Sequence, residues 1–344
     1  MTDRHSAGMP SVEGSAGANA GRTLSRRWST ARRGGRLRTG HRWHVGGKMR
    51  LRSSAPRRKR GPKDDLDAVF RKVERLTATG ATIGALELLA RRKTLDDRSL
   101  LGWPVSRTRV LSLNRRPGKY LDKVLRYPQV LGMVGARAAS GLALLAPRVG
   151  RKGRAVALAG MTATGAGLNL RSNYGLDGSD HLSFINFAVS LLEKLYPNDR
   201  KAREAALAFI AAQSCLAYFT SGVVKMTSPV WRSGDAISGV FRTRTYGDRF
   251  FYNLVKDRKL MAQALAWGVM VAEALFPLVL VAPRPVARMI LLAGMGFHLG
   301  NARFMGLNRF FWSFVATYPA VAHFSRHLGG NGEQRRALPE GATA

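Results

Sequence analysis

Eight apolar segments follow one another after Lys63, and short loops that carry basic residues or proline separate them. The stronger six lie at 129–146, 155–170, 204–224, 260–282, 286–306 and 310–324, and two weaker ones lie at 76–90 and 182–196. A membrane helix needs about 20 apolar residues, and only segments 204–224, 260–282 and 286–306 reach that length comfortably. The others must be short, tilted or partly interfacial. The pattern predicts an all-α, polytopic integral membrane helix bundle with eight membrane segments, within a range of seven to nine.

A soluble all-α protein is the alternative reading of these segments. The stretch "LMAQALAWGVMVAEALFPLVLVAP" at 260–283 argues against it, because Gln263 and Glu273 are its only polar side chains and a soluble helix would show a polar face. Small residues recur one turn apart at Gly132, Ala136 and Ser140, and again at Gly296 and Gly300. Such spacing is typical of membrane helices that pack closely.

The distribution of charge divides the chain into four parts. The whole sequence has 56 Lys and Arg against 21 Asp and Glu, a formal net charge of +35. Residues 1–65 are rich in Arg, Gly and Ser and lack an apolar pattern, so we expect a disordered tail. Residues 66–128 predict an amphipathic or weak membrane helix followed by a basic linker, residues 129–328 the membrane core, and residues 329–344 a flexible C-terminal tail.

The basic tail also predicts a partner. Its runs "RRGGRLR" and "PRRKRGPK" attract polyanions, with Trp28 and Trp43 as stacking groups if that polyanion is a nucleic acid. For a tail beside a membrane core, contact with anionic lipid is the expected role. We therefore expect the lipid bilayer and anionic lipid as partners, rather than nucleic acid.

Basic loops give an orientation, with two exceptions. If the tail is cytoplasmic and segment 76–90 crosses, the loops "RVGRKGR", "DRKAR" and "PRPVAR" all fall inside, as the positive-inside rule requires. The acidic loop "YGLDGSD" falls outside. The linker 91–126 and the loop 226–259 also fall outside, although both are basic.

A polar stripe runs along the predicted helix at 204–224. Ser214, Tyr218, Ser221 and Lys225 are spaced four, three and four residues apart, so they share one helix face. In one reading the hydroxyl groups pack against neighbouring helices and Lys225 extends to the lipid headgroups. In the other reading the stripe is a functional site, because an ionisable group at membrane depth is costly.

Glu273 lies in the middle of its apolar segment, and Pro277 follows one turn later, which frees a backbone carbonyl. Glu273 is either a structural acid, paired with an arginine such as Arg137 or Arg303, or a proton-handling group in a cavity. The sequence leaves both alternatives open.

His298 shares a helix face with Asn301 and Met305. At a rise of about 1.5 Å per residue, Lys225 at the outer lip places His298 roughly 10 Å deeper and Glu273 roughly 18 Å deeper. Lys225, His298 and Glu273 would then line one funnel.

Other signatures of chemistry are few. Cys215 is the only cysteine, which excludes a disulfide framework, a cysteine-based zinc site and a CxxC pair. The sequence has no phosphate-binding Walker motif, HExxH or GxSxG. The run "DGSD" at 177–180 carries two carboxylates, and we interpret it as a solvated turn rather than a metal site.

The stretch "AYFTSGVVKM", followed by "VWRSGDAISGVFRT", resembles the signature of the HTTM family, bacterial membrane proteins related to the membrane domain of vitamin K-dependent gamma-carboxylase. The matching positions are Tyr218, Phe219, Ser221, Gly222, Lys225, Trp231 and Gly234. The helix with Glu273 and Pro277, the stretch "FHLGNARFMGLNRFF" and the loop "YGLDGSDHL" are also similar to the family's motifs. The resemblance covers roughly residues 129–324.

This resemblance implies a role for Lys225 as the base that deprotonates a reduced naphthoquinone in the bacterial plasma membrane. A lysine removed from water gives up its proton more readily, and the neutral amine is a base. His298 or Glu273 would be its proton partner, and Ser214, Tyr218, Ser221 and Asn301 would bind the membrane quinone.

The carboxylase carries a large globular domain after its helices, whereas here a short tail follows Phe324. We therefore expect a non-catalytic signalling, immunity or assembly factor. The alternative is a carboxylase- or epoxidase-like membrane enzyme.

Overall fold

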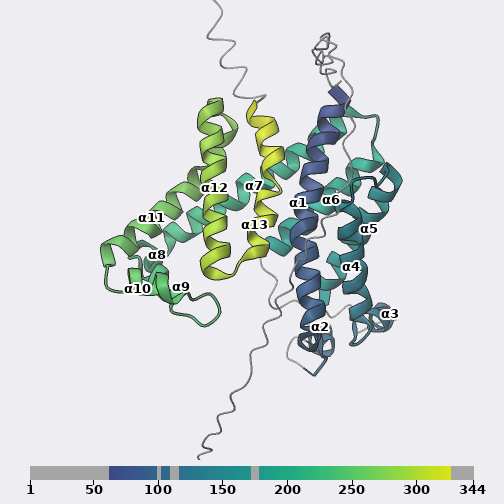
Figure 1. Ribbon diagram of the computed structural model, residues 1–344, viewed down its shortest axis with the longest axis horizontal. Coiled ribbons are helices and arrows are strands. Elements are labelled where there is room, and N and C mark those ends of the chain that lie inside the picture. The colour runs from purple at the N-terminus through teal and green to yellow at the C-terminus, as the bar shows by residue number, and fades with distance from the viewer. Residues whose placement is uncertain (1–61, 99–101, 109–115, 172–177, 327–344) are drawn as a thin grey trace, which may run out of the picture. The chain divides into compact units, whose positions relative to one another are not determined.

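The computed structural model describes residues 62–98, 102–108, 116–171 and 178–326 (Figure 1). Every regular element in these ranges is a helix, as the all-α prediction requires. The predicted C-terminal tail and most of the predicted disordered tail lie outside them. The first helix begins at Pro62, so residues 62–65 are helical and the predicted tail boundary at residue 65 was four residues too late.

The first half of the described chain forms a long helix, three short ones and then four long helices. They are α1 (Pro62–Ala90), η1 (Arg92–Leu95), α2 (Trp103–Thr108), α3 (Arg116–Leu125), α4 (Val130–Leu145), α5 (Arg151–Arg171), α6 (Gly178–Leu195) and α7 (Arg200–Thr227). The weak segment 76–90 is thus the second half of a helix that packs against α4, α6 and α13.

The second half contains three short helices followed by four further elements. They are α8 (Pro229–Arg232), α9 (Asp235–Phe241), α10 (Arg249–Val255), α11 (Lys259–Leu275), η3 (Phe276–Leu280), α12 (Arg284–Met305) and α13 (Asn308–Val315), and residues 318–326 are again helical. Pro277 explains the change from α11 to η3, because proline cannot donate the backbone hydrogen bond of an α-helix.

Two helices of the described chain are long and apolar enough to cross a membrane. They are α7 and the continuous helix α11–η3, Lys259–Leu280, and α4 is apolar but shorter. The predicted count of eight membrane segments is therefore not established by length and composition.

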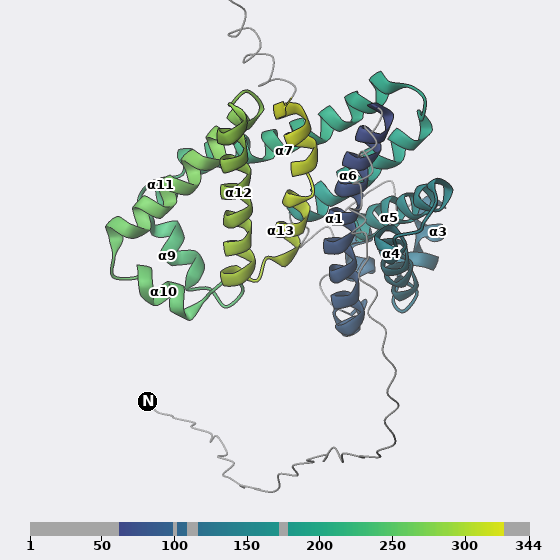
Figure 2. The same cartoon turned by 45° about the horizontal axis from the view of Figure 1, so that its top comes forward.

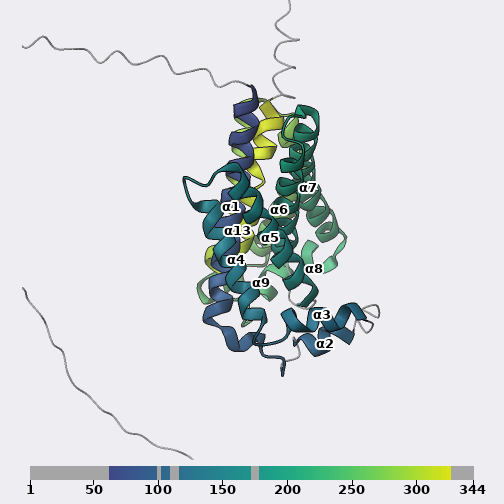
Figure 3. The same cartoon turned by 90° about the vertical axis from the view of Figure 1, so that its right-hand side faces the viewer.

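Side-chain contacts fix the direction of neighbouring helices. Arg154 near the start of α5 and Arg203 near the start of α7 bind Glu74 and Asp67 in the first half of α1. At the other end, Arg171 of α5 donates to the carbonyl oxygen of Leu95 at 2.6 Å, just after α1 ends. Helices α1 and α5 therefore run in the same direction, and Figure 3 shows α2 and α3 near the end of α1.

The main apolar core lies among α1, α7, η3 and the helix 318–326. Phe70, Leu207, Ile210, Val279 and Val321 are fully buried there. This core holds the start of α7 against the rest of the chain, so the second half of α7 extends toward α11 (Figure 2).

The predicted small-residue contacts are mostly wrong. A Cβ atom added at Gly132, Gly296 or Gly300 would meet nothing within 4 Å, so these glycines do not mark a close helix contact. The close approach is at Gly222 of α7 instead, where an added Cβ would lie 2.5 Å from the backbone nitrogen of Ala274 in α11.

The predicted turn "DGSD" is in part helical. Asp180 lies in the first turn of α6, and its carboxylate accepts a hydrogen bond from Arg309 at 3.2 Å. Asp177 is outside the described residues. The contact joins α6 to the start of α13. The dipole of α6 also favours a carboxylate in its first turn.

Candidate functional site

Lys225 and Glu273 form an ion pair between α7 and α11. The Lys225 Nζ atom lies 2.5 Å from Glu273 Oε2 and donates to Ser221 Oγ, also at 2.5 Å. It lies 5.3 Å from the centre of the Trp231 ring as well. The Lys225 side chain is 20% exposed, so it is turned toward Glu273 and does not extend away from the bundle to the headgroups.

Close packing at Gly222 brings these two residues together. An added Cβ there would lie 2.7 Å from the carbonyl oxygen of Met270 and 2.5 Å from the Ala274 nitrogen, so only glycine allows this approach. The end of α7 therefore meets the second half of α11, and Lys225 lies level with Glu273. The predicted depth difference between these two residues was wrong, because it placed the start of α11 at the end of α7.

The predicted arginine partners of Glu273 were also wrong. Arg137 donates to the carbonyl oxygen of Met161 at 3.0 Å. Arg303 lies 3.9 Å from Asp248. Glu273 is a paired acid, as one alternative required, but its partner is the lysine.

A second polar cluster joins α7 to α12 and to the helix 318–326. The Tyr218 hydroxyl lies 2.7 Å from His298 Nε2 and 2.6 Å from the Tyr318 hydroxyl. The His298 ring stacks on Phe314 at 4.4 Å between centres, and the Tyr218 ring stacks on Phe276 at 3.9 Å. These aromatic contacts hold the three polar groups in a water-poor place.

His298 keeps one unused hydrogen-bonding atom. The residue is buried, and within the described chain its Nδ1 atom has no hydrogen-bond partner. A buried polar atom without a partner costs free energy of about 1–3 kcal/mol. This ring nitrogen is therefore the atom of the cluster that is available to a bound group.

Of the remaining predicted site residues, Ser214 contacts another helix, whereas Asn301 does not bond to the other members of the site. Ser214 accepts a hydrogen bond from the Thr317 hydroxyl at 2.8 Å and is fully buried. Asn301 is half-buried on α12, and no hydrogen bond connects its side chain to another residue in the described ranges. All four members of the predicted stripe on α7 thus face other helices, whereas Asn301 makes no contact that ties it to them.

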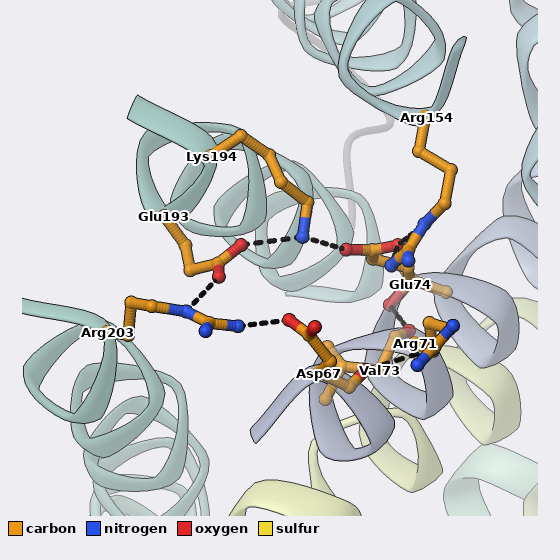
Figure 4. A network of polar contacts seen from close by, with 9 residues as sticks. Asp67, Arg71, Val73, Glu74, Arg154, Glu193, Lys194 and Arg203 are labelled. Carbon is orange, nitrogen blue, oxygen red and sulfur yellow. Dashed lines mark hydrogen bonds and ion pairs between the residues drawn. The ribbon is translucent and has the colours of Figure 1, made fainter. Parts of the chain in front are cut away.

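A larger charged cluster was missed by the sequence analysis (Figure 4). Its members are Asp67 and Glu74 of α1, Arg154 of α5, Glu193 and Lys194 of α6, and Arg203 of α7. We refer to these six residues as the charge network. Three acids face three cations from four helices, so the charges balance.

Alternating contacts connect the charge network. Arg203 binds Asp67, and its Nε atom donates to Glu193 Oε1 at 2.5 Å. Lys194 bridges Glu193 at 2.6 Å and Glu74 at 3.1 Å, and Arg154 binds Glu74. Each buried charge is therefore paired, as its burial requires.

One sequence signal pointed to this network. Asp67 and Glu74 are seven residues apart in "DLDAVFRKVE" and so share a helix face. The adjacent Phe70 and Val73 are fully buried, which shows that this face is turned inward.

The described ranges contain no group of three or more His, Cys, Asp or Glu side chains arranged to hold a metal ion. Comparisons of the chain with protein-family models, with curated proteins and with solved structures give no match. The site is consequently defined by its geometry alone: the partly buried Lys225–Glu273 ion pair and the histidine–tyrosine cluster, whose members on α7, Lys225 and Tyr218, are seven residues apart.

Proposed function

We propose that this chain is a multi-pass integral membrane protein related to the HTTM family, located in the bacterial plasma membrane. Its molecular role in this proposal is non-catalytic, that of a signalling, immunity or assembly factor.

The exposed apolar surface of the two longest apolar helices supports the membrane location. Only 39% of the apolar window of α7 and 28% of that of α11–η3 is buried. Phe219, Val224, Leu275 and Leu278 are among the exposed apolar side chains there. A core helix of a soluble protein would be mostly buried, so these faces need an apolar surrounding such as lipid.

Alkaline carbonate extraction of membranes from cells that express the full chain tests this location. We expect the protein to stay in the pellet and to require detergent for release. Recovery of a monodisperse protein without detergent would refute the proposal.

Single-cysteine labelling then tests the crossing of α7. Cys215→Ser removes the only cysteine, and Arg148→Cys, Asn198→Cys or Asn253→Cys adds one at an exposed position. We expect an impermeant maleimide to label Arg148→Cys and Asn198→Cys from one side of the membrane and Asn253→Cys from the other. Labelling of all three from one side would show that α7 does not cross.

The ion pair of Lys225 supports a non-catalytic role. A general base must be a neutral amine with its lone pair free, whereas the Lys225 amine is engaged in an ion pair with the Glu273 carboxylate at 2.5 Å. In the pair, Lys225 and Glu273 neutralise each other and link α7 to α11. The polar groups then specify how apolar helices associate.

A second candidate, a membrane enzyme that uses a reduced lipid quinone, is favoured by His298. Its unpartnered Nδ1 atom could accept a hydrogen bond from a quinol hydroxyl. In this reading Glu273 takes the proton of Lys225, and the neutral amine then acts as the base. Lys225 would be the catalytic base and Tyr218 would orient His298.

An assay of quinol oxidation separates the two candidates. The purified protein is mixed with a reduced naphthoquinone under oxygen, and Lys225→Arg is compared with the wild type, because arginine keeps the ion pair but cannot release its proton. If the protein is non-catalytic, the wild type and Lys225→Arg should both show only the background rate of quinol oxidation. Oxidation above background by the wild type that Lys225→Arg abolishes would establish the enzyme instead.

A further inference from the structure

The segment 241–260 presents a row of cations and apolar side chains outward. Tyr246, Phe250 and Leu260 are exposed, Phe250 at 71% and Leu260 at 82%. Six exposed cations lie among them: Arg242, Arg244, Arg249, Lys256, Arg258 and Lys259. We refer to this outward face as the 241–260 surface.

The inner side of the same segment is fixed to the protein. The Phe251 ring contacts Phe241 at 4.2 Å and Phe304 of α12 at 5.3 Å between ring centres. Val255 is fully buried, and the Asp248 carboxylate accepts a hydrogen bond from the Phe251 backbone nitrogen at 2.8 Å. The outward side chains are therefore presented by an anchored element, in which Phe250 is exposed and Phe251 is packed against the protein.

The charge of the surface is not neutralised by its own acids. Asp248 and Asp257 are the only acids in residues 241–260. Asp248 already caps α10 and lies 3.9 Å from Arg303. Asp257 lies 3.9 Å from Lys256 and is itself exposed, which makes a weak pair. Most of the six cations thus face outward without a carboxylate partner in the segment.

The 241–260 surface lies at the end of a candidate membrane-spanning helix. Helix α11, one of the two apolar candidate spans, begins at Lys259, at the end of the segment. Figure 2 shows α9 and α10 beside the first half of α11 and near the C-terminal end of α12. The surface therefore lies where a spanning helix would leave the hydrocarbon layer. This step depends on the proposed membrane location.

We propose that the 241–260 surface binds the anionic headgroups of the membrane leaflet next to it. Cations at the headgroup level attract acidic lipids, and exposed aromatic and aliphatic side chains between them insert into the interface. This explains why a basic loop is found where the positive-inside rule expects few cations: the charges serve lipid binding at that leaflet.

An acidic protein is a poorer match, because a solvated acidic surface offers no apolar partner for the exposed side chains of Phe250 and Leu260. A nucleic acid would match the cations and stack on the rings, so it serves as a competing ligand in the test.

The test uses the detergent-solubilised full chain in mixed micelles with phosphatidylglycerol or phosphatidylcholine, and native mass spectrometry counts the bound lipid. We expect the wild type to prefer phosphatidylglycerol, and added salt to weaken that preference. The variant Arg242→Gln/Arg244→Gln/Arg249→Gln should bind phosphatidylglycerol about a hundredfold more weakly, from about 1 kcal/mol for each cation.

A matched control removes three exposed cations elsewhere. Arg91→Gln/Arg92→Gln/Lys93→Gln changes the exposed run after α1, and we expect it to retain the preference. Phe250→Ser should weaken binding of both lipids by about tenfold, because the ring no longer inserts. Phe250→Ser also tests the surface if the triple variant does not fold.

Three results would overturn the inference. They are equal affinity of the wild type for both lipids, an unchanged preference in the triple variant, or displacement of the acidic lipid by an oligonucleotide at equal charge concentration. The experiments distinguish a failure of this inference from a failure of the proposed membrane location. If the protein resists carbonate extraction but shows no lipid preference, only this inference is refuted. If the protein prefers phosphatidylglycerol but is extracted from membranes by carbonate, only the proposal of integral insertion is refuted.

Discussion

The charge network and the Lys225–Glu273 pair both place charges inside the helices, but they differ in the number of partners. In the network Glu193, Lys194, Glu74 and Arg203 each contact two opposite charges. In the pair each charge has one opposite partner, and Ser221 adds a neutral hydrogen bond. The network joins the first half of α1 to the starts of α5 and α7 and to the end of α6, whereas the pair joins the end of α7 to the second half of α11.

This difference shows what each arrangement contributes. A charge with two partners cannot be removed without leaving two others unbalanced, which makes the network a rigid connection of α1, α5, α6 and α7. The pair contains no third charge, so both of its members can be replaced together with no charge left over. The same kind of interaction therefore serves as a structural connection in one region and as an exchangeable contact in the other.

The largest expected effect is that of Glu193→Gln in the network. The change leaves Arg203 and Lys194 buried with one acid fewer, and we expect the free energy of unfolding to fall by about 3–5 kcal/mol. Chemical denaturation of the detergent-solubilised protein measures this value.

A surface pair at the start of α7 is the control for Glu193→Gln. Glu204 lies 2.7 Å from Arg200 and is exposed, so Glu204→Gln should cost about 0.2–1 kcal/mol. Equal losses in both variants would mean that the network is no stronger than a surface pair.

The second prediction concerns the exchangeable pair. Lys225→Met leaves Glu273 buried without its cation, and the expected loss of unfolding free energy is about 2–3 kcal/mol, below that of a fully buried pair because Lys225 is 20% exposed. Adding Glu273→Gln removes the remaining charge, so the double variant should regain most of the loss. Denaturation of the two single variants and the double variant gives the coupling energy. Additive losses would contradict the pair.

The sequence predicted the helices and the face of α7 that is turned inward, and physical reasons explain both. Apolar runs of helical length leave few other structures, and the spacing of Ser214, Tyr218, Ser221 and Lys225 fixes a common face whatever that face contacts. The partner of Lys225 was not predictable in the same way. It depends on where α7 crosses α11, which is set by the contact at Gly222 and by the short helices after Thr227.

The charge network was missed for a different reason. Its members come from four helices between residues 67 and 203, and each looks like an ordinary solvated charge in its own segment. Burial of Glu74 and Glu193 follows only from the packing of α1 against α6. The function of the site, enzyme or scaffold, remains a prediction that the quinol assay tests.

The third prediction tests the close contact that brings Lys225 to Glu273. Gly222→Ala places a methyl group 2.5 Å from the Ala274 nitrogen, and such overpacking should lower the free energy of unfolding by about 1–3 kcal/mol. Gly296→Ala is the control, because its added Cβ meets nothing within 4 Å and alanine favours the helix by about 1 kcal/mol. A stabilised Gly222→Ala protein would show that α7 and α11 are further apart.

The smallest expected effect is in the histidine–tyrosine cluster. Tyr318→Phe removes one hydrogen bond, at 2.6 Å from the Tyr218 hydroxyl, but Tyr218 keeps its contact with His298 at 2.7 Å. The net loss should therefore be about 0.5–1.5 kcal/mol. Tyr218→Phe removes the hydroxyl that both partners share, leaves His298 Nε2 and the Tyr318 hydroxyl buried without it, and should cost more, about 1–3 kcal/mol. Denaturation of the two variants side by side gives the order. If Tyr318→Phe were the more damaging change, Tyr218 would not be the central member of the cluster.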